Sequence, residues 1–339
     1  MTVGDIFMKP NGNLISGLKS KEGCVMGHEI SAQVIEVGDN VTNFKPGDHV
    51  VVEVTGTCMD KERFEQSPRK HEEFCEACKA GHYNACDYLA LTGLGFQHGG
   101  LAQYLVTGQH KLIKYDDTKI PADVAAIIQP IAVSWHALSV SRVEEGHSAL
   151  IIGGGPIGLT TLFALKGHKS GKIVISEPAK ARRELAKSLG AEVYDPTGKS
   201  LQECVDDLKA LSPNGAGFNR TYDCSGLPIT FQTSVKTLTV RGIATNVAVW
   251  AHKHVEYEPM HITFSEMYVT GSICFVKKDF EESVKAFEDG LIPIDEVRKL
   301  ITSKVHLRDG VEKGFKELIN HKEKHVKILF SGFDELIDE

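Results

Sequence analysis

The chain has 339 residues, of which 42% are hydrophobic and 24% charged, as is typical of a globular protein long enough for two domains. Its formal net charge of -7 argues against nucleic-acid partners and anionic membrane surfaces, because both attract clustered Lys and Arg side chains. No signal pattern and no apolar run of about 18 residues is present, so we expect a cytoplasmic protein whose eight cysteines are reduced.

The first third of the chain is predicted to be β-rich. Residues 29–54 alternate apolar and polar side chains around two turn sequences, at residues 38–40 and 46–48, which indicates a β-meander. A polar stretch that contains cysteines follows, from Thr55 to about Leu91. Residues 91–106 are punctuated by glycines and are predicted to form further short strands.

A His-Glu pair, His28-Glu29, precedes the alternating run and suggests one corner of a catalytic metal site. A catalytic zinc ion takes three protein ligands and leaves one position open for water or substrate, so further ligands have to come from elsewhere in the chain. The alternative is an ordinary polar pair without a metal.

Four cysteines of the polar stretch suggest a second, structural zinc site. A C-x-x-C pair places two sulfurs on one side of a turn, and two more thiolates complete a closed tetrahedral site. The alternative is a set of unrelated cysteines, and His71 and His82 could substitute as ligands. The charged residues 59–74 are expected to be a solvated excursion. The four cysteines are Cys58, Cys75, Cys78 and Cys86.

After Pro121 the apolar residues follow a helical period, and from Ala149 onward predicted strands alternate with predicted helices. This alternation is typical of a parallel sheet covered by helices on both faces. Helices are expected at residues 156–169 and 179–190, and two more after Asp279. The predicted strands span residues 148–154, 172–177, 221–226, 242–250, 267–276 and 325–330.

A G-x-G-x-x-G motif lies between the first of these strands and its helix. Its glycines allow a tight turn, a close approach of the backbone to a pyrophosphate, and close packing of the helix, whose N-terminal N–H groups face the phosphates. Glu177 ends the next predicted strand, where a carboxylate accepts hydrogen bonds from the adenosine ribose and repels the extra phosphate of NADP. NAD is therefore the expected cofactor. The residues expected to bind it are Gly153, Gly155, Pro156, Ile157, Gly158, Glu177 and Arg182, the last of which is equally well explained as a solvated helix charge.

Taken together, these segments resemble the zinc-dependent medium-chain alcohol dehydrogenase family. Residues 27–50 look like its signature, with Ala32 where a glycine is usual. Residues 129–138, 153–159, 222–234 and 244–250 look closest to the fungal (R,R)-2,3-butanediol dehydrogenase branch, near sorbitol dehydrogenase. The resemblance covers essentially the whole chain.

The resemblance implies an α/β fold with a GroES-like, β-rich catalytic domain and a Rossmann domain with a doubly wound parallel sheet. We expect the zinc-binding catalytic domain at residues 1–133, the NAD-binding domain at 134–270, and a return to the catalytic domain at 271–339. It also implies NAD and Zn²⁺ as cofactors, a small-molecule alcohol or ketone substrate, and a homodimer or homotetramer formed through the dinucleotide domain.

The resemblance also identifies departures from the family pattern. The family's first catalytic zinc ligand is a cysteine in a G-x-C-G-[ST]-D segment upstream of the His-Glu pair, and this chain is expected to start just after that segment. The first cysteine of the structural site normally sits three residues before the second, whereas Cys58 lies much earlier. In the butanediol and sorbitol branch an acidic residue stands where this chain has Gln129.

His28, Glu29 and Gln129 therefore remain as the catalytic candidates, and Cys24 is a weak substitute for the missing thiolate. Trp135 and His136 match family positions that serve packing more than proton transfer. A bound catalytic zinc would act as a Lewis acid on the alcohol oxygen, and hydride would pass to the nicotinamide ring.

Three functions stay open at this point. The first is a dehydrogenase of secondary alcohols or vicinal diols, of the butanediol type. The second is a degenerate member that binds NAD(H) but lacks the catalytic zinc, and the third is a sugar-alcohol dehydrogenase acting on a substrate such as sorbitol or xylitol.

Overall fold

A computed structural model describes residues 24–60, 71–94, 97–250 and 254–337. The chain divides into two compact units. The first contains the residues up to Gln129, Cys274–Glu288, and the residues from Val297 onward; the second contains Pro130–Ile273 and Asp289–Glu296. The first unit is thus assembled from both ends of the chain. Among the described residues, none of the helices combines the length and apolar character that a membrane crossing requires.

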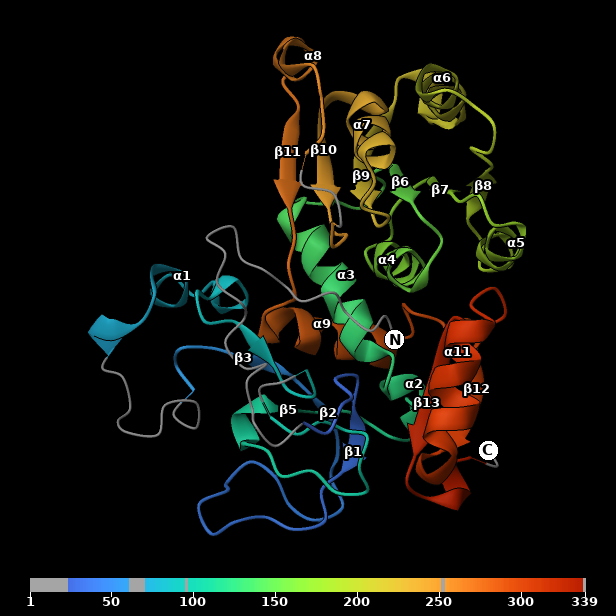
Figure 1. The fold of residues 1–339 in the computed structure, drawn as a ribbon. Coiled ribbons are helices and arrows are strands. Elements are labelled where there is room, and N and C mark those ends of the chain that lie inside the picture. Colours follow the sequence, from blue (N-terminus) through green and yellow to red (C-terminus); the bar gives the residue numbers. More distant parts are fainter. Residues whose placement is uncertain (1–23, 61–70, 95–96, 251–253, 338–339) are drawn as a thin grey trace. The chain divides into compact units, whose positions relative to one another are not determined.

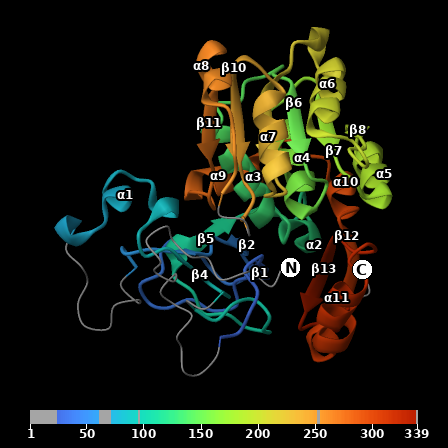
Figure 2. The ribbon, with the colours of Figure 1, turned by 45° about the horizontal axis from the view of Figure 1, so that its top comes forward.

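Six parallel strands form the sheet of the second unit, in the order β11-β10-β9-β6-β7-β8 (Figures 1 and 2). The chain moves outward from β6 to β7 and β8, and then returns to place β9 on the other side of β6. Such a reversal of strand order is the place where doubly wound sheets bind dinucleotides. The strands are β6 Ala149–Ile152, β7 Ile173–Ser176, β8 Glu192–Tyr194, β9 Phe218–Asp223, β10 Leu238–Asn246 and β11 Tyr268–Gly271.

Helices cover this sheet on both faces, as the alternation of elements in the sequence predicts. Figure 1 draws α4 and α5 on one side of the row from β6 to β8, and α6 and α7 on the other. Parallel strands are normally joined by right-handed crossovers. The helices are then expected on opposite faces, because new strands are added toward β8 in the first half of the unit and toward β11 in the second half. The helices are α3 Ile128–Val140, α4 Pro156–Gly167, α5 Lys180–Ser188, α6 Leu201–Leu211, α7 Pro228–Lys236, α8 Pro259–Phe264 and α10 Ile294–Arg298, with a 3₁₀ turn at Pro213–Gly215.

The core of the second unit follows from the apolar runs of the neighbouring strands β6 and β7. All four residues of β6 are buried, as expected for a parallel strand with helices on both faces. The doubly wound α/β architecture predicted from the sequence is therefore confirmed. The core cluster contains Leu150, Ile152, Val174, Tyr194, Cys204, Leu208 and Phe218.

The first unit is built from short strands. An antiparallel sheet has the order β1-β2-β5, β3 pairs with β4, and β12 pairs in parallel with β13. The strands are β1 Ser31–Gln33, β2 His49–Val52, β3 Thr55–Gly56, β4 Ala90–Leu91, β5 Leu112–Lys114, β12 Ile301–His306 and β13 Lys327–Ser331. The helices are α1 Glu76–Lys79, α2 Ala122–Ala125, α9 Lys277–Glu288 and α11 Glu317–Asn320, with 3₁₀ turns at His71–Glu73, Tyr83–Ala85, Gln109–Lys111, Leu307–Asp309 and Asp334–Leu336 and a π-helix at Gly310–Lys316.

Two of the expected strand regions differ from the structure. The predicted meander forms only β1 and β2, which are joined by residues 34–48 without a strand, and residues 97–108 also contain no strand. The glycines of residues 97–108 allow two backbone segments to pack closely, and they do not pair as β-strands. A Cβ atom at Gly99 would lie 2.1 Å from the carbonyl oxygen of Gly27, and Gly100 N–H donates to that same oxygen. This segment therefore supports the backbone just before His28.

Candidate functional site

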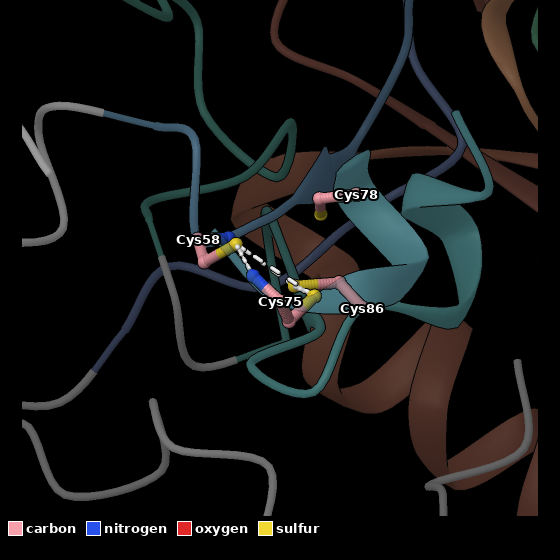
Figure 3. A group of neighbouring side chains, drawn as sticks. All are labelled: Cys58, Cys75, Cys78 and Cys86. Carbon is pink, nitrogen blue, oxygen red and sulfur yellow. Dashed lines mark hydrogen bonds between the residues drawn. The ribbon is translucent and has the colours of Figure 1, made fainter. Parts of the chain in front are cut away.

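The four cysteines of the first unit lie together at the end of β3 and around α1 (Figure 3). Their sulfur atoms all lie within 4.8 Å of one another. The Sγ atom of Cys75 is 3.8 Å from that of Cys58 and 3.7 Å from that of Cys86. A tetrahedral zinc site with Zn–S bonds of about 2.3 Å has sulfur atoms about 3.8 Å apart. The cluster of Cys58, Cys75, Cys78 and Cys86 thus fits a zinc ion held by four thiolates.

Backbone N–H groups point at these sulfur atoms. Cys58 N and Tyr88 N donate to the Cys86 Sγ at 3.2 and 3.3 Å, and Cys75 N donates to the Cys58 Sγ at 3.5 Å. Such bonds stabilise thiolates. Burial raises the pKa of Cys86 to about 11 and also raises that of Cys78. For Cys75 burial acts in the same direction, but N–H groups of Asp87 and Cys78 outweigh it and lower the pKa to about 7.

Four neighbouring thiols of this kind cannot all ionise without a cation between them, which is the situation that a structural zinc ion satisfies. His82 precedes the 3₁₀ turn Tyr83–Ala85 and does not belong to the cluster of four sulfurs. The side chain of His71 lies outside the described residues.

The glycine motif lies where β6 passes into α4, at the reversal of strand order. Gly153 has φ +105°, a conformation that favours glycine. A Cβ atom at Gly158 would lie 1.8 Å from the Gly153 carbonyl oxygen, so only glycine lets the first turn of α4 pack onto the loop. Gly155 precedes α4, and Pro156 begins it. A Cβ at Gly155 meets only the Arg182 guanidinium, at 3.9 Å, which leaves the backbone accessible on that side.

Glu177 follows β7, and both of its carboxylate oxygens accept backbone hydrogen bonds. Gly154 N donates to Oε2 and Ala179 N to Oε1, each at 2.7 Å, and the residue is only 4% exposed. The structure therefore brings the acidic residue against the glycine loop. Arg182 Nη1 lies 4.0 Å from the Glu177 Oε2 atom, with a side chain that is 36% exposed. The neighbouring Arg183, which sequence reasoning did not single out, braces this turn by donating to the Glu177 carbonyl oxygen at 2.8 Å.

Glu29 in the first unit forms an ion pair that the sequence did not indicate. Lys327 Nζ on β13 lies 2.5 Å from both carboxylate oxygens of Glu29, and the Lys327 side chain is 7% exposed. Burial raises the pKa of Glu29, but the Lys327 ammonium outweighs it and holds that pKa below its ordinary value. The one available signal was a lysine inside the apolar run of residues 325–330.

The other catalytic candidates lie in the first unit as well. Burial lowers the pKa of His28, which favours the neutral imidazole that binds metals. Gln129 is buried in the first turn of α3, with 6% exposure. Cys24 Sγ lies within hydrogen-bond distance of two carbonyl oxygens, that of Gln97 at 3.1 Å and that of Val25 at 3.3 Å. Within the ranges that the structure describes, the four-cysteine cluster is the only group of three or more His, Cys, Asp or Glu residues placed to hold a metal.

The described residues thus supply His28 and Glu29 as two candidate ligands for a catalytic metal, without a third of the usual types.

In the second unit, Trp135 stacks on the His168 ring at a centroid distance of 4.2 Å and packs against Gly167. This contact is consistent with a packing role for Trp135.

Comparisons with known proteins agree with this architecture. Residues 4–117 match the family described as the alcohol dehydrogenase GroES-like domain, and residues 156–289 match the zinc-binding dehydrogenase family. The chain is 46% identical over 330 residues to a probable diacetyl reductase [(R)-acetoin forming] 2 of Saccharomyces cerevisiae, covering 97% of this chain and 79% of that protein. It is 44% identical over 328 residues to the (R,R)-butanediol dehydrogenase of the same yeast, covering 97% and 85%.

A solved structure shows the same fold. The crystal structure of 2R,3R-butanediol dehydrogenase from Bacillus subtilis superimposes with a TM-score of 0.76 at 28% identity, covering 92% of this chain and 82% of that one. Family matches over both units and identities above 40% along nearly the whole chain confirm the resemblance to the butanediol branch. The chain belongs to the zinc-binding dehydrogenases with an alcohol dehydrogenase GroES-like domain.

Proposed function

We propose that this protein is an NAD-dependent dehydrogenase that interconverts a secondary alcohol or vicinal diol with its ketone, with 2,3-butanediol and acetoin as the substrate type. The observation that carries the proposal is the 46% and 44% identity, over 97% of the chain, to a probable diacetyl reductase and to an (R,R)-butanediol dehydrogenase. The more distant D-xylulose reductase A of Aspergillus oryzae is 28% identical, which favours the diol over a sugar alcohol.

The glycine loop and Glu177 support NAD as the cofactor. Gly153, Gly155 and Gly158 would let the pyrophosphate approach the backbone at the N-terminus of α4, with Pro156 and Ile157 in its first turn. The Glu177 carboxylate would accept hydrogen bonds from the ribose hydroxyls. Its buried negative charge would repel the 2'-phosphate of NADP. Arg182 would lie at the edge of the same site, where it also partners Glu177.

His28, Glu29 and Gln129 are our candidates for the substrate end of the site, on the basis of their match to the family signature. A zinc ion bound there would polarise the substrate oxygen. In this chain Lys327 holds the Glu29 carboxylate by both oxygens, and Gln129 offers a neutral oxygen. The second zinc ion of the proposal is structural and is assigned to the four cysteines.

The test is a substrate and cofactor panel on the purified full chain. Absorbance at about 340 nm would follow NADH formation from the three stereoisomers of 2,3-butanediol, and NADH or NADPH consumption with acetoin and diacetyl. Sorbitol and xylitol serve as the sugar-alcohol comparison. We expect turnover of a butanediol isomer with a clear preference for NAD, together with about two zinc ions per chain. Faster turnover of the sugar alcohols would reject the diol assignment.

A second candidate function is a cofactor-binding protein without turnover. The neutral Gln129 and the engagement of Glu29 by Lys327 favour it, because both leave a metal with fewer anionic donors. In that case NADH binding would quench the tryptophan fluorescence, each chain would contain one zinc ion, and none of the alcohols would be oxidised. Two zinc ions with diol-dependent NADH formation would eliminate it.

We also propose a homodimer or homotetramer formed through the edge of the six-stranded sheet. Within the described part of the chain, strand β11 pairs only with β10, and Tyr268 and Val269 on it are 50% and 40% exposed. Light scattering after size exclusion would test it. A charged residue in place of Val269 should give monomers.

Eight free cysteines are compatible with the cytoplasmic location proposed for this protein.

A further inference from the structure

The fourth sulfur of the cysteine cluster reaches it in an unusual way. Cys58 lies 17 positions before Cys75, whereas the family's usual first cysteine lies three residues before the second, where this chain has Glu72. Lengthening the connection from three to 17 residues lowers the effective concentration of the fourth thiolate by about tenfold, from loop-closure entropy alone. Something other than the short chain connection therefore has to hold Cys58 beside the other three sulfurs.

The carboxylate of Asp60 closes a tight turn around Cys58. Its Oδ2 atom accepts hydrogen bonds from Thr57 N at 2.5 Å and from Thr57 Oγ1 at 3.2 Å. Asp60 N donates back to the Thr57 carbonyl oxygen at 3.3 Å, and Met59 N donates to the Thr57 hydroxyl at 3.1 Å. The residues on both sides of Cys58 are thus held by the Asp60 side chain, which is 9% exposed.

Lys111 ties this turn to the core of the first unit. Its side chain is 1% exposed, and its Nζ atom donates to the Thr55 carbonyl oxygen at 3.0 Å and lies 3.4 Å from Asp60 Oδ1. The same Asp60 oxygen lies 3.4 Å from His110 Nε2. A buried ammonium is costly unless it is paired, so this lysine holds the chain just before and just after Cys58 in one position.

We propose that Asp60 and Lys111 are positioning residues for the fourth zinc ligand. They fasten residues 55–60 so that the Cys58 thiolate lies 3.8 Å from that of Cys75, as the tetrahedral site requires. Together they replace the short connection that the usual spacing would provide. The inference rests on the proposed structural zinc site, and it assigns to this chain's own residues a role in completing that site.

Cobalt substitution tests the proposal independently of turnover. Tetrahedral Co²⁺ shows thiolate-to-metal charge-transfer bands whose intensity follows the number of sulfur ligands, and Cys58→Ser gives the three-sulfur reference. We expect Lys111→Met to shift the spectrum toward that reference and to speed zinc transfer to a chelator by about tenfold, as the loop-closure argument requires. The matched control is Lys114→Met, because Lys114 is 48% exposed and pairs with Asp48 at 2.7 Å, away from residues 55–60.

A second variant keeps the test decisive if Lys111→Met does not fold. Asp60→Asn retains the shape of the side chain and one acceptor oxygen but loses the charge that faces Lys111, and we expect a smaller shift in the same direction. A four-sulfur spectrum and a transfer rate within twofold of Lys114→Met, in either variant, would overturn the positioning role. If the unmodified chain showed no difference from Cys58→Ser, the zinc site itself would be wrong, and the assignment of Asp60 and Lys111 would be wrong with it.

Discussion

Replacing Lys327 by Met should destabilise the first unit more than any surface substitution. The change removes the partner of the Glu29 carboxylate, both of whose oxygens lie 2.5 Å from the Lys327 Nζ atom. Breaking a buried ion pair from one side costs about 3–5 kcal/mol, because a charge is left in the interior without compensation. The Lys327 side chain is 7% exposed and that of Glu29 is 23% exposed. Partial access of water to Glu29 places the expected loss near the lower end, at about 3 kcal/mol.

Thermal unfolding followed by circular dichroism measures this loss. At about 2–4 °C for each kcal/mol, the melting temperature should fall by roughly 6–12 °C. The control is Lys313→Met, which removes an exposed ion pair with Asp309 and should cost under about 1 kcal/mol. The double variant Glu29→Gln with Lys327→Met should recover part of the loss, because no buried charge remains. A loss for Lys327→Met no larger than for Lys313→Met, or no recovery in the double variant, would refute the reasoning.

Three further substitutions test the glycine loop, a catalytic candidate and a paired carboxylate of the first unit. Gly158→Ala should abolish NADH binding measured by fluorescence titration, because its Cβ would lie 1.8 Å from the Gly153 carbonyl oxygen; retained affinity would contradict the close packing of α4. Gln129→Glu should raise kcat/KM for the preferred diol by tenfold or more and increase the zinc content, if a neutral oxygen is what weakens the catalytic metal site; unchanged kinetics would exclude that explanation. For Asp123, burial opposes the shift, but Arg298 and Lys304 outweigh it and hold the pKa below its ordinary value. The stability that this carboxylate contributes is therefore present above about pH 4 and lost as the pH falls through its lowered pKa, so the difference in melting temperature between wild type and Asp123→Asn should shrink from pH 7 toward pH 3.

The parallel sheet could be predicted because its signal is local. Strands such as β6 and β7 are short apolar runs, the helices between strands have their own period, and the rule of right-handed crossover then leaves few topologies. The position of the glycine motif follows from the same pattern, since it had to fall between the first strand and its helix. The approach of Glu177 to Gly154 could be inferred as well, because parallel neighbours end at the same edge of a sheet.

The first unit was harder to predict, because its key contacts join distant parts of the chain. Lys327 and Glu29 are 298 positions apart, and no periodicity links them. Gly99 and Gly100 suggest a turn between two strands when the sequence is considered alone. In the structure they pack against the backbone of Gly27 and belong to no strand. The spacing of Cys75, Cys78 and Cys86 predicted a metal site from the sequence, and the structure brings their sulfur atoms within 4.8 Å of one another. The support of Cys58 by Asp60 and Lys111 became visible only in three dimensions.

The assembly of the first unit from both ends of the chain has a consequence for biosynthesis. Most of the second unit, Pro130–Ile273, is contiguous and can reach its folded state while the ribosome is still translating. Glu29, by contrast, has no counterion until strand β13 has been translated, 298 positions later in the chain. During this interval most of the second unit has been translated while the first unit is still incomplete, so we expect chaperone binding to matter most at that stage.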